Sequence, residues 1–192
     1  GNFIKNINSK YYKIIFSGLA FNSKQVKKNN IFFALKGNKL NGNKYVSDAI
    51  NRGAKIIVSD ENLKINKKDI IFIKHNKPRK LLAEISYKLL IKKPKNLVAV
   101  TGTNGKSSVS DFYYQILNLN NKRSASIGTV GIQFDNKNKT IDKTTLDPIT
   151  LSKVINYLSK RKINNMILEA SSHGLKQNRL DGLNITSAIF TN

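Results

Sequence analysis

The chain has 192 residues, of which 40% are hydrophobic, enough for one large domain or two small ones with ordinary cores. It contains no cysteine, which excludes disulfides and thiolate metal sites, and no apolar run approaches the ~20 residues that a membrane-spanning helix needs. Residues 1–12 are polar and contain lysine, without the apolar core of a signal peptide. We therefore expect a globular cytoplasmic protein with no membrane partner.

The formal charge of +23 at pH 7 invites a nucleic-acid function, because basic side chains neutralise phosphates. Most of this charge is lysine, spread along the whole chain among asparagine and isoleucine, which are residues that A+T-rich codons specify. Basic patches with a function are usually clustered and rich in arginine. The charge therefore predicts a weak attraction to polyanions and no specific nucleic-acid partner, with a basic nucleic-acid-binding module as the alternative.

Short strands alternate with a helix in the first half of the chain. Strands are predicted for three apolar runs, at residues 30–35, 55–58 and 70–73. Between the first two, Tyr45, Ala49 and Ile50 share one face at helical spacing, and Gly53 is well placed to end this helix. Strand, helix and strand in this order indicate a small α/β domain.

A longer helix is expected from Pro78 to about Ile91. The apolar residues that recur in it at helical spacing are Leu81, Leu82, Ile85, Leu89 and Leu90. Residues 92–96 then combine charge, proline and a loss of periodicity, which is typical of a domain boundary. We therefore predict an N-terminal domain at residues 1–94 and a central domain at residues 95–192.

The second half begins with a continuous apolar strand at 97–100, as expected in a sheet that is covered on both faces. A glycine turn follows, and a helix is predicted from Ser107 to a point between 118 and 121. Its predicted apolar stripe consists of Val109, Phe112, Tyr113, Ile116 and Leu117. A helix through 151–158, strands at 165–168 and 186–190, and a loop at 135–139 complete the prediction of an α/β domain with a mostly parallel sheet.

The glycine turn has the sequence TGTNGKSS, residues 101–108. Its glycines allow the backbone to wrap around phosphate oxygens, and the N–H groups at the start of the helix point at the anion. Lys106 supplies a mobile positive charge for the β- and γ-phosphates, and the Ser107 hydroxyl is placed to bind Mg²⁺. Val100 stands where the strict phosphate-loop pattern has glycine. The alternative is an ordinary glycine turn that precedes lysine and serine by chance.

This variant loop resembles the ATP loop of the Mur ligase and folylpolyglutamate synthetase superfamily. The segment LEASSHGL at 168–175, followed by Gln177 and Arg179, is similar to an element of the Mur ligases that add the third residue to the peptidoglycan peptide. Two more segments fit the same branch of the family, the Thr144-Thr145 pair before Asp147-Pro148 and IGTVG at 127–131. The resemblance runs from about residue 21 to residue 192 and implies a phosphate-loop-type central domain.

The resemblance implies an ATP-dependent, ADP-forming amide ligase that acts on UDP-MurNAc-L-Ala-D-Glu in the synthesis of peptidoglycan precursors. ATP would phosphorylate the D-glutamyl carboxylate, and the amino group of meso-diaminopimelate or L-lysine would attack the acyl phosphate. Lys106 and Glu169 would be catalytic, and Glu169 would share Mg²⁺ with Ser107 at the carboxyl end of a strand. The ATP-binding residues would be Gly102, Thr103, Asn104, Gly105, Lys106, Ser107 and Ser108.

The resemblance also implies which residues hold the UDP-MurNAc-dipeptide. In the central domain they would be Thr144, Thr145, Ser171, Gln177 and Arg179. In the first domain Phe21 and Ser23 would lie at the uridine, and Asn22 stands where the family usually has aspartate. A nucleotide-sugar loop would span 37–41 and would contain Asn38, Lys39 and Leu40.

Other interpretations remain open for several of these residues. The alternative for Glu169 is a surface acid at the end of a strand. The alternative for Tyr113 and Tyr114 is stacking on bases, although their place in a helix favours packing in the core or at its rim. His173 is interpreted as a loop histidine that shapes the site. A folylpolyglutamate synthetase would share the ATP loop but lack the first domain and the SSHGL segment.

Members of the family continue into a segment with a second magnesium-binding histidine and a carbamylated lysine, and then into a C-terminal domain that closes over ATP and selects the amino acid. The chain starts at Gly1 and stops at Asn192 after an apolar run, so we expect it to be part of a longer protein. By itself we expect it to bind the UDP-sugar weakly and not to ligate. The pattern contains no broad apolar patch, and we therefore expect a monomer.

Overall fold

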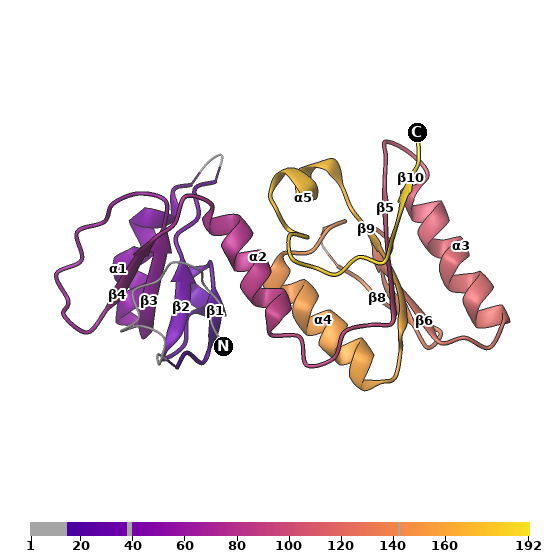
Figure 1. Cartoon of the computed structure of the whole chain (residues 1–192), viewed down its shortest axis with the longest axis horizontal. Helices are drawn as coiled ribbons and strands as arrows, with labels where there is room; N and C mark the ends of the chain where they lie inside the picture. The colour runs from indigo at the N-terminus through magenta and orange to yellow at the C-terminus, as the bar shows by residue number, and fades with distance from the viewer. Residues whose placement is uncertain (1–14, 38–39, 142) are drawn as a thin grey trace. The chain divides into compact units, whose positions relative to one another are not determined.

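The structure is a computed structural model that describes residues 15–37, 40–141 and 143–192 (Figure 1). Contacts between residues divide the chain into two compact units, Gly1–Ile85 and Ser86–Asn192. The division falls inside helix α2 (Pro78–Lys88), earlier in the chain than the limit predicted after residue 94. That prediction followed the charge and proline of residues 92–96, whereas the last turn of α2 belongs to the second unit by its contacts.

The first unit is built on a sheet in which every strand runs parallel to its neighbour. In spatial order its strands are β1 (Gly18–Ala20), β2 (Asn30–Phe33), β3 (Ala54–Ser59) and β4 (Ile71–Lys74). The connections contain the short helices η2 (Ser23–Gln25), η3 (Gly42–Tyr45) and α1 (Val46–Asn51). The predicted strands and the helix between the first two are confirmed, with Tyr45 in η3 rather than in α1.

One apolar cluster forms the core of the first unit. Phe32 of β2 and Ile57 of β3 are almost fully buried and belong to the same cluster as Ala49 of α1. Gly53 ends α1, because its N–H donates to the carbonyl of Ile50 at 3.0 Å and its φ of 103° lies in the region that favours glycine. The apolar runs and the helix face predicted from the sequence therefore meet in one core.

The second unit is built on a mixed sheet with the strand order β10-β5-β9-β6-β7-β8. Its strands are β5 (Asn96–Thr101), β6 (Ser124–Gly128), β7 (Gly131–Phe134), β8 (Lys137–Lys139), β9 (Asn165–Glu169) and β10 (Ser187–Phe190). Its helices are α3 (Lys106–Leu119), α4 (Pro148–Lys160) and α5 (Ser172–Lys176). The first four strands of the order pair in parallel, and β7 and β8 are antiparallel, so the predicted mostly parallel sheet is confirmed.

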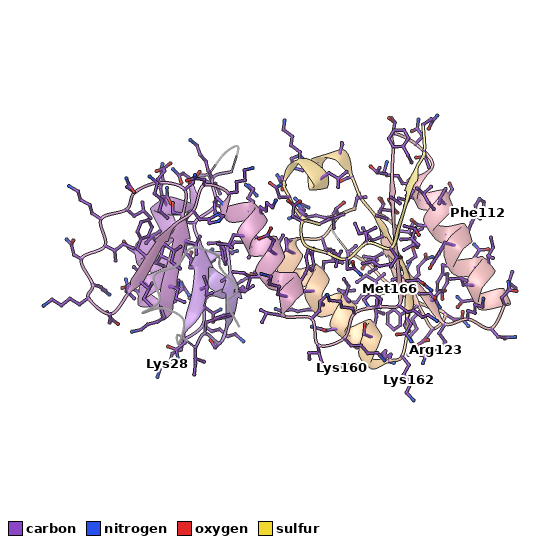
Figure 2. All side chains as sticks on the ribbon, in the orientation of Figure 1. Lys28, Phe112, Arg123, Lys160, Lys162 and Met166 are labelled. Carbon is purple, nitrogen blue, oxygen red and sulfur yellow. The ribbon has the colours of Figure 1, made fainter. Side chains whose placement is uncertain are left out.

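Helices lie on both sides of this sheet, with α3 on one side and α4 on the other (Figure 1). Val98, Val100 and Ile167 form a buried cluster with Val109 and Tyr113 of α3. The residues that alternate with them along β5 and β9 are buried as well, among them Leu97 and Met166, and Figure 2 shows Met166 in the interior of this unit. The continuous apolar strands thus occur where both faces of a sheet are covered.

The predicted loop at 135–139 is wrong in part. Residues Lys137–Lys139 form β8, which pairs antiparallel with β7, and only Asp135 and Asn136 form the connection. Both turn residues have positive φ, 47° and 55°, as a two-residue hairpin turn requires. All three residues of β8 are exposed, so the strand has no apolar alternation that the sequence could have revealed.

The predicted apolar stripe of α3 is also wrong in part. Phe112 and Ile116 are 61% and 57% exposed, and Figure 2 shows Phe112 on the outer side of the helix. The buried residues of the helix are Ser110 and Tyr114. The prediction that the tyrosines pack in the core or at its rim is confirmed for Tyr114 by its burial. In the part of the chain that the structure describes, no helix combines the length and the apolar character needed to cross a bilayer.

Candidate functional site

The turn between β5 and α3 has the backbone that a phosphate loop needs. Gly102 and Gly105 have φ values of 138° and 82°, and Gly105 is the residue that precedes the first turn of α3. A β-carbon on Gly102 would collide with the backbone and side-chain oxygens of Thr191. The N–H groups at the start of a 14-residue helix therefore open directly onto this turn.

The end of β10 supports the turn from the other side. Thr191 N–H donates to the carbonyl of Thr101 at 2.8 Å, and Thr103 N–H donates to the carbonyl of Asn192 at 2.7 Å. The Thr191 hydroxyl donates to the carbonyl of Asn104 at 2.5 Å. These bonds fix the turn at both strands, so its shape is set by the sheet and not by the turn alone.

The two polar residues that the motif singles out lie next to each other on the first turn of α3. The Lys106 ammonium donates to the carbonyls of Gly102 and Thr103 at 2.7 and 3.0 Å, so it lies inside the loop. The Ser107 hydroxyl donates to Oε2 of Glu169 at 3.2 Å. The structure thus brings Ser107 to Glu169, which lies 62 residues later in the sequence, and Lys106 is next to Ser107 on the same turn of α3.

Glu169 is the last residue of β9 and is only 2% exposed, so its interpretation as a surface acid is wrong. Thr129 N–H donates to its Oε1 at 3.0 Å, and the Thr129 hydroxyl donates to its Oε2 at 2.9 Å. In the described part of the chain no ion pair involves this carboxylate. The sequence motif contained Thr129, but no role was predicted for it.

Ser107 and Glu169 fit a magnesium ion. Mg²⁺ binds oxygen ligands at about 2.0–2.1 Å in octahedral geometry, so two neighbouring ligand oxygens lie about 3.0 Å apart. Ser107 Oγ and Glu169 Oε2 are 3.2 Å apart. Among the described residues, no group of three or more His, Cys, Asp or Glu side chains is placed to hold a metal. A pair of protein oxygens is nevertheless sufficient for Mg²⁺, which keeps waters and takes its other ligands from phosphates.

A second polar cluster surrounds the carboxyl end of β9. Thr145 is 3% exposed, and its hydroxyl donates to the carbonyl of Glu169 at 2.9 Å while it accepts from Ser171 N–H at 2.9 Å. The Ser171 hydroxyl lies 3.0 Å from the same oxygen and accepts from Gly174 N–H at 3.1 Å, which caps α5. Thr145 therefore holds the strand end and the start of α5 together.

Arg179 extends this cluster. Its Nε and Nη2 donate to Oε1 of Gln177 at 3.1 and 2.7 Å, and its Nη1 donates to the carbonyl of Thr145. Gln177 in turn contacts Nε2 of His173 at 2.8 Å, and His173 lies in helix α5 rather than in the predicted loop. The five residues predicted in the central domain thus gather in one region, with Thr144 joined to it by a 3.0 Å contact between its hydroxyl and that of Thr129.

Tyr87, which sequence reasoning did not single out, fixes the backbone of Arg179. Its hydroxyl donates to the Arg179 carbonyl at 2.5 Å, and the side chain is almost fully buried. Burial raises the pKa of the Tyr87 hydroxyl well above its usual value, and the nearby carboxylates of Asp147 and Asp181 add to this rise. The hydroxyl is therefore protonated at neutral pH and can donate this hydrogen bond.

The residues predicted in the first domain lie in the first unit. Ser23 is buried at the start of η2, and Asn22 caps this helix by accepting from Lys24 N–H at 3.0 Å. The pKa of Asp48 is lowered mainly by a hydrogen bond from the Ser23 side chain and next by one from Arg52. Phe21 is half-buried and Leu40 is exposed. Asn38 and Lys39 lie outside the described residues.

Two family descriptions match the chain in succession. The description of the Mur ligase family, catalytic domain, matches residues 15–88, and that of the Mur ligase middle domain matches residues 100–192. The UDP-N-acetylmuramoyl-L-alanyl-D-glutamate--2,6-diaminopimelate ligase of Rickettsia montanensis is 41% identical over 181 residues, which are 91% of this chain and 37% of that protein. The ligase of the same name from Chelativorans sp. (strain BNC1) is 39% identical over 176 residues, 92% of this chain and 36% of that protein.

Solved structures agree with these matches. A structure of a UDP-N-acetylmuramoyl-L-alanyl-D-glutamate--2,6-diaminopimelate ligase superposes with a TM-score of 0.81 at 29% identity, over 92% of this chain and 36% of that one. The MurF ligase from Thermotoga maritima in complex with ADP superposes with a TM-score of 0.54 at 20% identity, over 83% of this chain and 33% of that one, which shows a shared fold. The chain spans little more than a third of the length of these relatives. Because the two family matches follow one another along the chain and cover both units, the chain belongs to the Mur ligase family.

Proposed function

We propose that the protein is a cytoplasmic, ATP-dependent ligase that adds 2,6-diaminopimelate to UDP-MurNAc-L-Ala-D-Glu during the synthesis of peptidoglycan precursors. The observation that carries the proposal is the 3.2 Å contact between Ser107, at the start of the phosphate-loop helix, and the buried Glu169 at the end of a neighbouring parallel strand. The names of the relatives favour diaminopimelate over L-lysine. Because the chain spans little more than a third of those relatives, the complete reaction is proposed for the whole protein.

The phosphate loop would bind ATP through backbone N–H groups and one mobile cation. The loop residues Gly102, Thr103, Asn104, Gly105 and Ser108 would surround the phosphates, and Lys106 would exchange its two carbonyl partners for γ-phosphate oxygens. Ser107 and Glu169 would hold Mg²⁺, which when bound offsets the negative charge of the phosphates. Phosphoryl transfer requires little covalent chemistry from the protein, so positioning and charge are what these residues supply.

The reaction would proceed in two balanced steps. An oxygen of the D-glutamyl carboxylate attacks the γ-phosphorus of ATP, the bond between that phosphorus and the β,γ-bridging oxygen breaks, and the products are ADP and an acyl phosphate. The neutral amine of diaminopimelate then attacks the acyl carbon, the carbon–oxygen bond to phosphate breaks, and an amide, inorganic phosphate and a proton are formed. Lys106 would neutralise charge on the transferred phosphoryl group in the first step.

Each unit would contribute its own residues to the binding of the UDP-MurNAc-dipeptide. In the second unit, Thr144, Ser171, Gln177 and Arg179 lie around the end of β9, and Arg179 is suited to a carboxylate or phosphate. The hydroxyl of Thr145 is already engaged by Glu169 and Ser171, so its contribution would be to hold Ser171 in place. Phe21, Ser23 and Asn38 of the first unit would contact the uridine end.

Thermal unfolding tests the proposal, because a ligand that binds only the folded state stabilises it. At 100 times its Kd, UDP-MurNAc-L-Ala-D-Glu should add about 2.7 kcal/mol, which corresponds to a rise in Tm of about 5–10 °C for a chain of this size. MgATP should raise Tm in the unaltered chain, and the variant Lys106→Ala should lose that rise while it keeps the rise caused by the dipeptide substrate.

Two results would contradict the proposal. One is a Tm that neither ligand changes. The other is tight binding of DNA at physiological salt that is unaffected by Lys106→Ala, since this would favour a basic nucleic-acid-binding module. The match of residues 15–88 to a Mur ligase domain supports a uridine-nucleotide substrate over folate, because a folylpolyglutamate synthetase is expected to lack that domain.

A further inference from the structure

Thr129 has no part in the mechanism above, although it contacts the carboxylate of Glu169 more closely than Ser107 does. It lies in the two-residue link between β6 and β7. Its backbone N–H donates to Glu169 Oε1 at 3.0 Å, and its hydroxyl donates to Oε2 at 2.9 Å. One residue therefore contacts both oxygens of the carboxylate, which fixes the rotation of that group about its last bond.

The packing around Glu169 strengthens the effect of the two hydrogen bonds from Thr129. A β-carbon on Gly128 would overlap the Glu169 carboxylate, so the carboxylate lies directly against the backbone of β6. Glu169 is 2% exposed, and no ion pair in the described part of the chain orients it. Its direction therefore depends on neutral hydrogen-bond donors, namely Thr129 and Ser107.

Proton counting decides which acceptor takes the Thr129 hydroxyl proton. A threonine hydroxyl has one proton, and a carboxylate is a stronger acceptor than a second hydroxyl. The Thr129 hydroxyl has two acceptors within reach, Glu169 Oε2 at 2.9 Å and the Thr144 hydroxyl oxygen at 3.0 Å. Its single proton therefore goes to the carboxylate, the stronger acceptor.

We propose that Thr129 is a positioning residue of the Mg²⁺ site, one that turns Oε2 of Glu169 towards Ser107 and thereby raises the affinity for the metal. This inference rests on the proposed function of Ser107 and Glu169. When a cation binds, the Ser107 hydroxyl proton must point away from Oε2, and among the described residues the two bonds from Thr129 are then the contacts that orient the carboxylate. Groups that orient metal ligands in this manner change metal affinity about 10–100-fold when they are removed.

Two variants of the 192-residue chain separate the hydroxyl from the shape of the side chain. Thr129→Val keeps the volume and the backbone N–H but removes the hydroxyl, and Thr129→Ser keeps the hydroxyl. Binding of a fluorescent ATP analogue is followed while Mg²⁺ is titrated, and it is measured again in EDTA. We expect Thr129→Val to raise the Mg²⁺ concentration at half-maximal binding about tenfold, with affinity in EDTA unchanged. Thr129→Ser should stay within about twofold of the unaltered chain.

The outcomes distinguish this inference from the proposed function. If the unaltered chain binds the nucleotide with a clear Mg²⁺ dependence and Thr129→Val has the same dependence, the inference is wrong and the proposed function stands. A third outcome is that Thr129→Val weakens binding of the ATP analogue to the same extent with Mg²⁺ and in EDTA and also lowers Tm. The residue then has only a structural role, and the inference is wrong as well. If the unaltered chain binds no nucleotide under any condition, the proposed ATP site and this inference fail together.

Discussion

Glu169 is a buried carboxylate whose hydrogen-bond partners in the described part of the chain are all neutral. Burying a charge in this way costs stability unless a counter-charge is present, and at this position the charge is useful only for a cation. A neutral glutamine satisfies the same bonds, because its oxygen can accept from Thr129 N–H and its NH₂ group can donate to the Thr129 and Ser107 oxygens. Stability and metal binding should therefore respond in opposite directions to the loss of this charge.

Glu169→Gln is expected to raise the Tm of the metal-free chain by about 2–4 °C, the shift that about 1 kcal/mol gives in a chain of this size. The same variant should lose the dependence of ATP binding on Mg²⁺. Differential scanning calorimetry and a Mg²⁺ titration measure the two effects. Glu169→Ala is the control, since it leaves the donors of Thr129 and Ser107 without partners and should lower Tm. A glutamine variant with a lower Tm and unaltered metal dependence would show that Glu169 has a purely structural role.

At the level of elements, sequence patterns succeeded for several elements that have a buried face. The runs at 97–100 and 165–168 predicted strands because β5 and β9 lie in the middle of a sheet covered on both faces. They failed where burial does not decide the structure, as in β8, whose residues are all exposed, and in α3, where Ser110 rather than Phe112 faces inward. The sequence analysis also did not predict β1, which has only three residues, or β6 and β7, although most of their residues are buried.

The same reasoning explains which site residues could be predicted. Lys106 and Ser107 follow from a local motif, because strand, glycine turn and helix are continuous in the chain. Thr129 could not be found in this way, since its role depends on β6 lying beside β9. The parallel register that pairs Ile127 with Leu168 brings Thr129 to Glu169, and strand order is information that a single sequence does not contain.

Helix α4 offers a test at the scale of a single element, because one side chain begins it. Asp147 accepts from Thr150 N–H at 3.0 Å and from the Thr150 hydroxyl at 2.7 Å, directly before Pro148. Asp147→Ala should lower the free energy of unfolding by about 1 kcal/mol, measured by urea denaturation. Asp147→Asn keeps the capping oxygen and should retain most of the stability. Equal losses in both variants would assign the effect to the charge of Asp147 and not to the cap.

At the scale of the whole molecule, charge should limit stability. The chain has 34 basic and 11 acidic residues, so most basic side chains have no acidic partner. Repulsion among these unpaired positive charges should outweigh the attraction within the ion pairs. The ion pairs that the structure describes are largely exposed, such as Arg52–Asp48 at 2.9 Å with side chains 47% and 43% exposed. Exposed pairs of this kind contribute about 0–1 kcal/mol each. Screening these attractions with salt should therefore cost little stability.

Raising NaCl from 0.01 to 0.15 M shortens the Debye length from about 30 Å to about 8 Å and should therefore raise Tm. Repulsion among charges across the whole surface is screened over that range, whereas hydrogen-bonded pairs in contact are screened much less. Lys106→Ala should show the same rise, because the effect comes from net charge and not from chloride bound in the phosphate loop. Thermal unfolding at several salt concentrations measures both. A Tm that falls with salt would mean that the exposed ion pairs outweigh the repulsion, and a rise that disappears in Lys106→Ala would instead place the stabilising anion at the start of α3.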